Sequence, residues 1–271
     1  KAILDQLTTG TLYAFDQDPD AKNNLPDHPN LVFIAANFRY IKNHLRLHGA
    51  KKVDGILADL GVSSHQFDEG SRGFSIRFDG PLDMRMNPAI GISVEEVLAT
   101  YEEQALYDLF RKHTDLKSLK PLVHGLLLAR VQSPLKTTAE LRELCEPLAP
   151  RGGWHKYIAQ VFQGLRMEVN KELEVLEDLL NGCIDVLTPG GRLVVMSYHS
   201  LEDRMVKNFI KEGKATGQTE SDFFGVKRLP FKAITRKPVV ATAEENAKNP
   251  RATSAKLRIA ERSEHEWNRD E

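Results

Sequence analysis

Short apolar runs alternate with helically spaced apolar positions in the first and last parts of the chain. The early runs predict strands at Thr11–Phe15, Leu31–Ala36 and Val53–Leu57. Helical spacing after the second strand predicts a helix at Phe38–His48. The late part repeats the pattern beyond the Thr188–Gly191 turn, with strands at Arg192–Ser197, Phe231–Thr235 and Ala255–Ala260 and a helix at Leu201–Gly213. Strands that alternate with helices are typical of an α/β fold with a parallel, doubly wound sheet.

The middle of the chain contains helix starts and almost no strand pattern. Three pairs fit a capping box ahead of an apolar periodic run, namely Ser93 with Glu96, Thr100 with Glu103 and Thr137 with Glu140. A long helical pattern then runs from about Tyr157 to Leu187. We therefore expect a Rossmann-like core formed by residues 1–82 and 167–271. An all-helical insertion, residues 83–166, would interrupt it on the substrate side.

The composition narrows the class of protein. Among 271 residues, 37 Lys and Arg nearly balance 38 Asp and Glu, and no apolar stretch reaches the roughly 20 residues of a bilayer-spanning helix. Two cysteines exclude a disulfide scaffold and suit a reducing cytoplasm, and we expect no metal. Residues 201–262 carry 14 basic and 8 acidic side chains, which fits a polyanionic partner and equally an ordinary solvated surface.

The start of the chain suggests missing structure. Residues 1–7 have the pattern of the end of a helix, closed by Gly10, and no Met precedes them. A doubly wound core normally begins with a strand and a glycine-rich loop. We expect both of these to precede Lys1 in the natural protein.

Two carboxylates follow predicted strands. Asp16 follows the first of them, a position that commonly binds ribose hydroxyls of NAD, FAD or S-adenosylmethionine (SAM); a turn or helix-capping aspartate would look the same. Asp59 lies at the end of the third predicted strand and precedes a loop of Gly and Ser residues that includes Ser63. There its carboxylate either accepts a hydrogen bond from an amine or helps to cap a turn. This order of acids resembles SAM methyltransferases more than dehydrogenases.

Two further segments carry candidate chemistry. Residues 72–86 mix Arg, Phe and Met with glycines, which suits single-stranded nucleic acid, although a loop pinned by apolar side chains would show the same mixture. At residues 198–204 a strand runs into a helix, and Ser200 with Asp203 is expected to form the helix N-cap pair. Tyr198 and His199 precede that cap and could face a ligand.

Long stretches of this sequence resemble the MraW/RsmH family of bacterial methyltransferases. The matching stretches are Asp59–Gln66 (DLGVSSHQ), Arg72–Ser75 (RGFS), Asp79–Met86 (DGPLDMRM), Tyr198–Arg204 (YHSLEDR) and Asn249–Arg258 (NPRATSAKLR). The resemblance implies transfer of a methyl group from SAM to a cytidine N4 of 16S ribosomal RNA in the small subunit. It also implies SAM contacts at Asp16, Phe38, Asp59 and Gln66. The family's His-Pro-Ala-Thr-Arg is replaced by residues 155–159 (HKYIA) followed by Gln160, so no role of that arginine carries over.

The expected reaction is an attack of the amine on the methyl group, with the base extruded and aligned by the protein. Asp59 is the first candidate to accept a hydrogen bond from N4, with Ser63 and His199 as helpers. Phe67, Phe74 or Phe78 could stack on the base. RNA phosphates are expected at Arg72, Arg77, Arg85, Arg251, Lys256 and Arg258, the last two on a solvent-facing side of a strand. A nicotinamide-dependent enzyme and a non-catalytic RNA-binding module remain alternatives.

Overall fold

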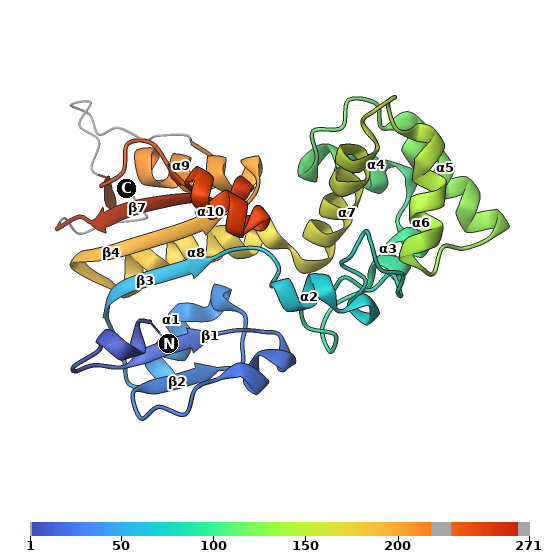
Figure 1. The fold of residues 1–271 in the computed structure, drawn as a ribbon. Coiled ribbons are helices and arrows are strands. Elements are labelled where there is room, and N and C mark those ends of the chain that lie inside the picture. Colours follow the sequence, from blue (N-terminus) through green and yellow to red (C-terminus); the bar gives the residue numbers. More distant parts are fainter. Residues whose placement is uncertain (1, 218–228, 265–271) are drawn as a thin grey trace. The chain divides into compact units, whose positions relative to one another are not determined.

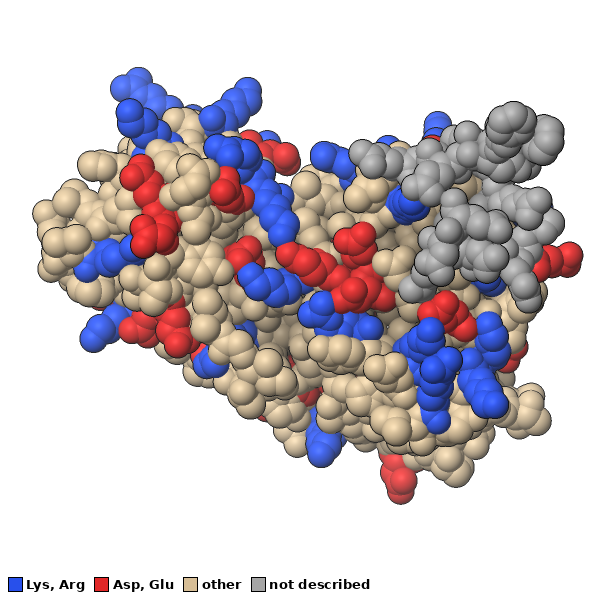
Figure 2. Space-filling view, turned by 180° about the vertical axis from the view of Figure 1, so that it is seen from behind, with Lys and Arg blue, Asp and Glu red and all other residues tan. Residues whose placement is uncertain are grey.

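The computed structural model describes residues 2–217 and 229–264 and divides into two compact units (Figure 1). The sheet unit comprises Lys1–Gly61 and Leu173–Glu271, and the helix unit comprises Val62–Glu172. None of the helices in the described ranges is long and apolar enough to cross a membrane. On the face seen in Figure 2, basic and acidic side chains are interspersed, in keeping with the balanced composition.

The sheet unit holds all the named strands of the described residues. A parallel pair, β1 (Leu12–Phe15) and β2 (Leu31–Ile34), stands apart from a sheet of order β3-β4-β7-β5, with β6 also pairing with β7. The strands of that sheet are β3 (Val53–Asp59), β4 (Leu187–Ser197), β5 (Phe231–Ala233), β6 (Val239–Val240) and β7 (Lys256–Arg262). β3 and β4 are parallel, whereas β7 runs antiparallel to β4. The fold is therefore mixed α/β. The predicted strands are present, but the sheet is not all parallel, because β7 runs antiparallel to β4, β5 and β6.

The helices of the sheet unit follow the predicted alternation with the strands. They are the 3-10 segments η1 (Leu4–Gln6), η2 (Pro19–Asn24), η3 (Phe38–Tyr40) and η6 (Pro250–Ser254) and the α-helices α1 (Ile41–Leu47), α8 (Glu172–Val186), α9 (Ser200–Glu212) and α10 (Ala243–Lys248). Apolar side chains of α1, α8 and α9 join those of β3 and β4 in one buried cluster. The cluster fixes the strands whose carboxyl ends carry the candidate acids.

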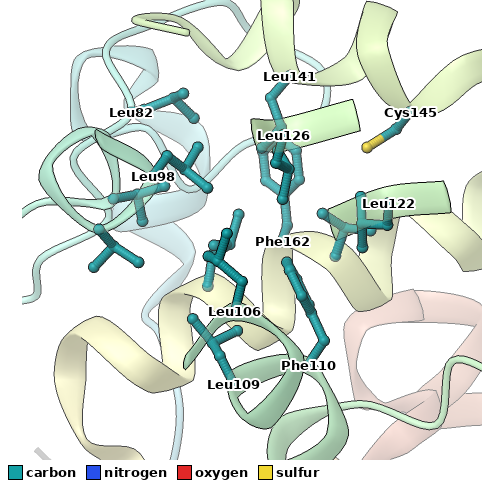
Figure 3. Close-up of a cluster of buried hydrophobic side chains, with 14 of the residues drawn as sticks. Leu82, Leu98, Leu106, Leu109, Phe110, Leu122, Leu126, Leu141, Cys145 and Phe162 are labelled. Atoms are coloured by element: carbon teal, nitrogen blue, oxygen red, sulfur yellow. The ribbon is translucent and has the colours of Figure 1, made fainter. Parts of the chain in front are cut away.

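The helix unit is formed by helices and connecting loops. Its elements are α2 (Ser64–Asp68), η4 (Gly70–Arg72), α3 (Val94–Thr100), α4 (Glu103–His113), α5 (Lys120–Gln132), α6 (Thr138–Cys145), η5 (Glu146–Leu148) and α7 (Trp154–Asn170). Large buried side chains from α3 to α7 meet in a second cluster, among them Leu106, Phe110 and Leu122 (Figure 3). Because this cluster is separate from that of the sheet unit, each unit has a core of its own.

Two of the three predicted capping boxes are present, those that begin with Ser93 and Thr137. The third is wrong. Thr100 is the last residue of α3, where its hydroxyl donates to the carbonyl of Glu96 at 2.6 Å, and α4 instead begins after Glu102. A Thr inside a helix commonly binds the carbonyl four residues earlier, which removes it from the capping role.

The single long helix predicted for residues 157–187 is two helices, α7 and α8. Lys171 lies between them with φ 51°, a left-handed conformation that ends a helix. The adjacent Asn170 explains the break, because its side chain donates to the carbonyl of Met84 at 2.7 Å and accepts from the N–H of Met86 at 2.7 Å. These contacts anchor a loop that is distant in the sequence. The apolar periodicity continues across the break between the two helices and therefore does not reveal it.

The loop of residues 70–83 belongs to the helix unit, although the predicted boundary placed it in the core. Pro81 forms a β-bridge with Thr137, and the N–H of Leu82 donates to the carbonyl of Lys136 at 2.9 Å. The Asp79 carboxylate accepts from the N–H of Ala139, also at 2.9 Å. These bonds tie the loop to the start of α6, so the unit begins at Val62 instead of residue 83.

Candidate functional site

Asp16 lies directly beyond the carboxyl end of β1. Its N–H donates to the carbonyl of Ile34 at 3.2 Å, which joins the ends of β1 and β2. The exposed carboxylate accepts from the N–H of Asp18 at 2.8 Å. Partial burial raises the pKa of Asp16, and the bond from Asp18 only partly opposes this. The side chain keeps acceptor capacity at the strand edge where ligands of open α/β sheets bind.

Phe38 begins η3, just beyond the carboxyl end of β2. The preceding Asn37 caps this turn by accepting from the N–H of Arg39 at 3.0 Å, and its amide donates to the Gln17 side chain at 2.9 Å. The turns after β1 and β2 are thereby tied together. Phe38 is partly buried against the core of the sheet unit. The structure thus brings Phe38 and Asp16 to one edge of the strand pair.

Asp59 ends β3, in register with Met196 of β4. The hydroxyl of Tyr198, just beyond β4, donates to the Asp59 carboxylate at 2.8 Å. Partial burial raises the pKa of Asp59 although the Tyr198 bond acts to lower it, and partial burial together with that same bond raises the pKa of Tyr198 to about 12. Tyr198 is therefore a neutral donor that orients an exposed carboxylate. The sequence placed it near the site but gave no reason to pair it with Asp59.

His199, predicted as a catalytic helper, is the N-cap of α9. Its Nδ1 accepts from the N–H of Glu202 at 3.4 Å, and the buried Glu202 carboxylate accepts from the N–H of Tyr198 at 3.0 Å. The other ring nitrogen lies 3.1 Å from Glu202, within ion-pair distance but without hydrogen-bond geometry. The predicted cap pair of Ser200 and Asp203 is wrong, because the helix starts one residue earlier, at Ser200, and His199 is its N-cap.

Ser63 and Gln66 form the capping box of α2, in the helix unit. Ser63 Oγ accepts from the N–H of Gln66 at 3.2 Å, and Gln66 Oε1 accepts from the N–H of Ser63 at 3.0 Å. Gln66 is buried. Both side chains therefore hold the start of a short helix, and their roles toward the base and SAM stay predictions.

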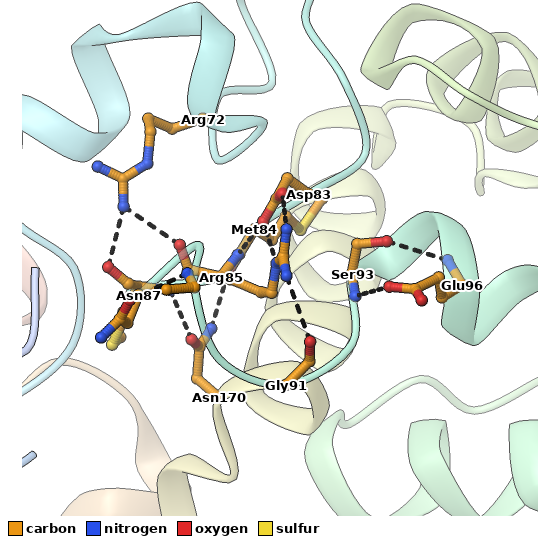
Figure 4. Close-up of polar contacts among 11 residues, drawn as sticks. Arg72, Asp83, Met84, Arg85, Asn87, Gly91, Ser93, Glu96 and Asn170 are labelled. Atoms are coloured by element: carbon orange, nitrogen blue, oxygen red, sulfur yellow. Dashed lines mark hydrogen bonds and ion pairs between the residues drawn. The ribbon is translucent and has the colours of Figure 1, made fainter.

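Two of the predicted RNA contacts hold a loop together (Figure 4). Arg72 donates to the carbonyls of Arg85 and Met86 at 3.2 and 2.9 Å. Arg85 pairs with Asp83 at 2.7 Å, and its hydrogen bonds and charge hold the pKa of Asp83 below its usual range although burial acts to raise it. Both guanidinium groups thus serve the loop itself. Arg77, in contrast, is exposed.

The predicted solvent-facing pair on β7 is wrong for Arg258. Its side chain bonds Asp203 of α9 at 2.7 Å, and the residue is only 7% exposed. Lys256 also reaches Asp203, at 3.5 Å, so both cations share a face that α9 covers. Alternation along a strand shows which residues share a face, but not which face meets solvent. Arg251, at η6, is exposed.

Together these features define a mixed α/β protein with acceptors at the carboxyl ends of parallel strands. The model of the MraW methylase family matches residues 1–263. "Ribosomal RNA small subunit methyltransferase H" of Cytophaga hutchinsonii is 50% identical over 264 residues, 97% of this chain and 88% of that protein. The proteins of the same name from Bacteroides fragilis and Christiangramia forsetii are 49% and 47% identical, over 97% and 96% of this chain and 86% of each relative. The chain belongs to the MraW methylase family.

Proposed function

We propose that this protein methylates the exocyclic N4 of a cytidine in 16S rRNA, with SAM as methyl donor and the small ribosomal subunit as partner in the cytoplasm. The sheet unit would be a Rossmann-like SAM-binding core, and the helix unit would be a helical insertion on the substrate side. The observation that carries the proposal is the pair of exposed carboxylates, Asp16 and Asp59, each at the carboxyl end of a parallel strand in a chain of this family. The names of the relatives support an rRNA substrate.

The end of the β1–β2 pair suits the nucleoside part of SAM. Within the described part of the chain, the Asp16 carboxylate accepts a hydrogen bond only from the N–H of Asp18, so its remaining lone pairs can accept from ribose hydroxyls. Phe38 offers a ring beside the adenine. SAM supplies an electrophilic methyl group when bound. The protein's contribution is to hold that group in line with the incoming amine.

Asp59 is the proposed acceptor for the N4 amine. Cytosine N4 is a weak nucleophile because its lone pair is delocalised into the ring. A carboxylate that accepts a hydrogen bond from the amine N–H therefore favours attack of N4 on the methyl group. The Tyr198 hydroxyl fixes one Asp59 oxygen and leaves the other for the amine. As the new C–N bond forms, the bond between the methyl carbon and the sulfonium sulfur would break, and the sulfur would leave as a neutral thioether. The amine proton is then released, and Asp59 or, as the sequence predicts, Ser63 or His199 would receive it. Because a base inside a helix is out of reach, it must be extruded first.

Transfer of labelled methyl groups tests the proposal. The full-length protein is incubated with methyl-labelled SAM and small subunits that lack the modification, and labelled nucleosides are separated after digestion. We expect label in N4-methylcytidine, strong loss with Asp59→Asn, and little change with Asp54→Asn, an exposed aspartate at the other end of β3. RNA binding without transfer would support a non-catalytic module, and stabilisation by NAD but not SAM would support a nicotinamide enzyme.

A further inference from the structure

A pocket of about 870 Å³ opens in the helix unit, and none of the residues to which SAM contacts are assigned above lines it. Its walls come from the loop that carries Arg77, from α6 and from the start of α7, so all the lining residues belong to one unit. The volume is within the range of sites that bind small organic ligands. The proposed methyl transfer gives this pocket no task.

The loop wall is held on both sides of Arg77. Arg142 of α6 donates to the carbonyl of Ile76 at 2.9 Å, and the Thr138 hydroxyl donates to the carbonyl of Phe78 at 3.1 Å. Arg77 is therefore fixed in the chain between two anchored neighbours, while its side chain remains exposed. A wall that is already ordered costs little conformational entropy when a ligand binds.

Two of the residues that line the pocket, Arg77 and Arg142, carry guanidinium groups. In the described part of the chain, neither Arg77 nor Arg142 forms an ion pair, and the Nε of Arg142 is buried without a hydrogen-bond acceptor. Helix α7 starts here at Trp154, and its N-cap is Gly153, which has no side chain to accept from the N–H groups of the first turn. The part of the pocket near these arginines and the start of α7 can therefore bind an anionic group.

The other lining residues do not suit a bare anion. Trp154 is anchored against the core cluster of the unit and offers an indole ring, with Ile158 beside it in the lining. Glu143 and Glu146 contribute two exposed carboxylates, which repel a free polyanion and can accept from amino groups. Guanidinium, indole and carboxylate together match the phosphate, the planar base and the exocyclic amine of a nucleotide.

We propose that this pocket binds one unstacked nucleotide of single-stranded RNA, separate from the cytidine that is methylated. The inference rests on the proposed function, because that function supplies the RNA. Arg77 and Arg142 bind the phosphate, Trp154 stacks on the base, and Glu143 or Glu146 accepts from its amino group. The pocket thereby increases the affinity for RNA and fixes the position of the RNA strand on the protein, without contacting the reacting atoms.

The test measures binding of a fluorescently labelled, unstructured oligoribonucleotide to the full-length protein at several salt concentrations. We expect Arg77→Ala to weaken binding roughly tenfold and to lower the magnitude of the log–log salt slope by about one. Trp154→Ala should weaken binding roughly 5- to 150-fold through lost stacking. Since that change also removes core packing, Trp154→Phe is included and should retain part of the affinity. In a Trp267→Phe background Trp154 is the one tryptophan left in this sequence, and the oligoribonucleotide should quench its tryptophan fluorescence.

Arg111→Ala is the matched control, because Arg111 is an exposed arginine of the same unit that does not line the pocket. It should leave the affinity nearly unchanged. Equal effects of Arg77→Ala and Arg111→Ala, or quenching by inorganic phosphate as strong as by RNA, would overturn the nucleotide site. SAM affinity is measured in parallel. If SAM binding and methyl transfer persist while the pocket variants bind RNA normally, the pocket inference fails alone; if the wild type neither binds SAM nor transfers methyl groups, the proposed function fails.

Discussion

Replacing Asp203 by Asn should destabilise the sheet unit severely, because it leaves the Arg258 guanidinium buried without a counter-charge. The two side chains are 13% and 9% exposed and lie 2.7 Å apart at their closest atoms. Breaking such a buried pair costs about 3–5 kcal/mol, several times the value of an exposed pair. With a denaturant slope of about 2–3 kcal/mol per molar urea, the midpoint should fall by roughly 1–2.5 M.

The pH dependence gives a second measurement of the same pair. Burial acts to raise the pKa of Asp203, but the hydrogen bond and charge of Arg258 outweigh it, so the folded pKa lies below the ordinary value. A lowered folded pKa stabilises the protein above the unfolded pKa of about 3.9, and this contribution is lost as pH falls through the folded value. The difference between wild type and Asp203→Asn should therefore be largest near neutral pH and should shrink in acid.

Urea unfolding followed by circular dichroism measures both effects, and two further variants control them. Glu261→Gln removes an exposed partner of Arg192 on the same two strands, β4 and β7, and should shift the midpoint only slightly. Combining Asp203→Leu with Arg258→Met should restore most of the stability, since no unpaired charge remains buried. A midpoint for Asp203→Asn within the range of Glu261→Gln would refute the reasoning.

Three further predictions concern the site and the core of the helix unit. Asp16→Ala should weaken SAM binding by about 2 kcal/mol without unfolding the protein, because a charge-assisted bond to ribose is lost; calorimetry decides this. Tyr198→Phe removes a bond that lowers the pKa of Asp59, so the acid limb of the kcat/KM profile should move to higher pH, and an unmoved limb would argue against Asp59 as the acceptor. Glu168→Ala should cost about 1–3 kcal/mol, because the fully buried His113 loses its partner at 3.0 Å. Hydrogen bonds, led by that of His113, hold the pKa of Glu168 far below its usual range. The difference in free energy of unfolding between wild type and Glu168→Ala, measured by urea titration, should therefore shrink as pH falls.

The sequence predicted those features that are determined locally. The strands β1 and β3 and the boxes at Ser93 and Thr137 depend on apolar spacing and on a few neighbouring residues, which the sequence displays. The positions of Asp16 and Asp59 could be predicted from the same apolar spacing, because each residue lies at the end of an apolar run or directly after it. Their position at strand ends could therefore be predicted without the structure.

Features that depend on distant contacts could not be predicted in this way. The break between α7 and α8 depends on Asn170 and a loop more than eighty residues earlier in the chain. The burial of Arg258 depends on the packing of α9 over β7, and no pattern within β7 distinguishes a face covered by a helix from one in solvent. Tyr198 could be paired with Asp59 only once the ends of β3 and β4 were known to adjoin.

The loop of residues 70–91 shows why a recognisable motif is not necessarily the site of the chemistry. A side chain on Gly80 would meet the carbonyl of Gly70 at 1.9 Å, and one on Gly73, which has φ 75°, would meet the carbonyl of Pro81 at 2.1 Å. Arg72 is bonded to carbonyls of the same loop. The residues that make this stretch recognisable are thus needed to fold it tightly. In the proposed nucleotide pocket the loop would contribute indirectly, because its anchored residues Ile76 and Phe78 hold the exposed Arg77 between them.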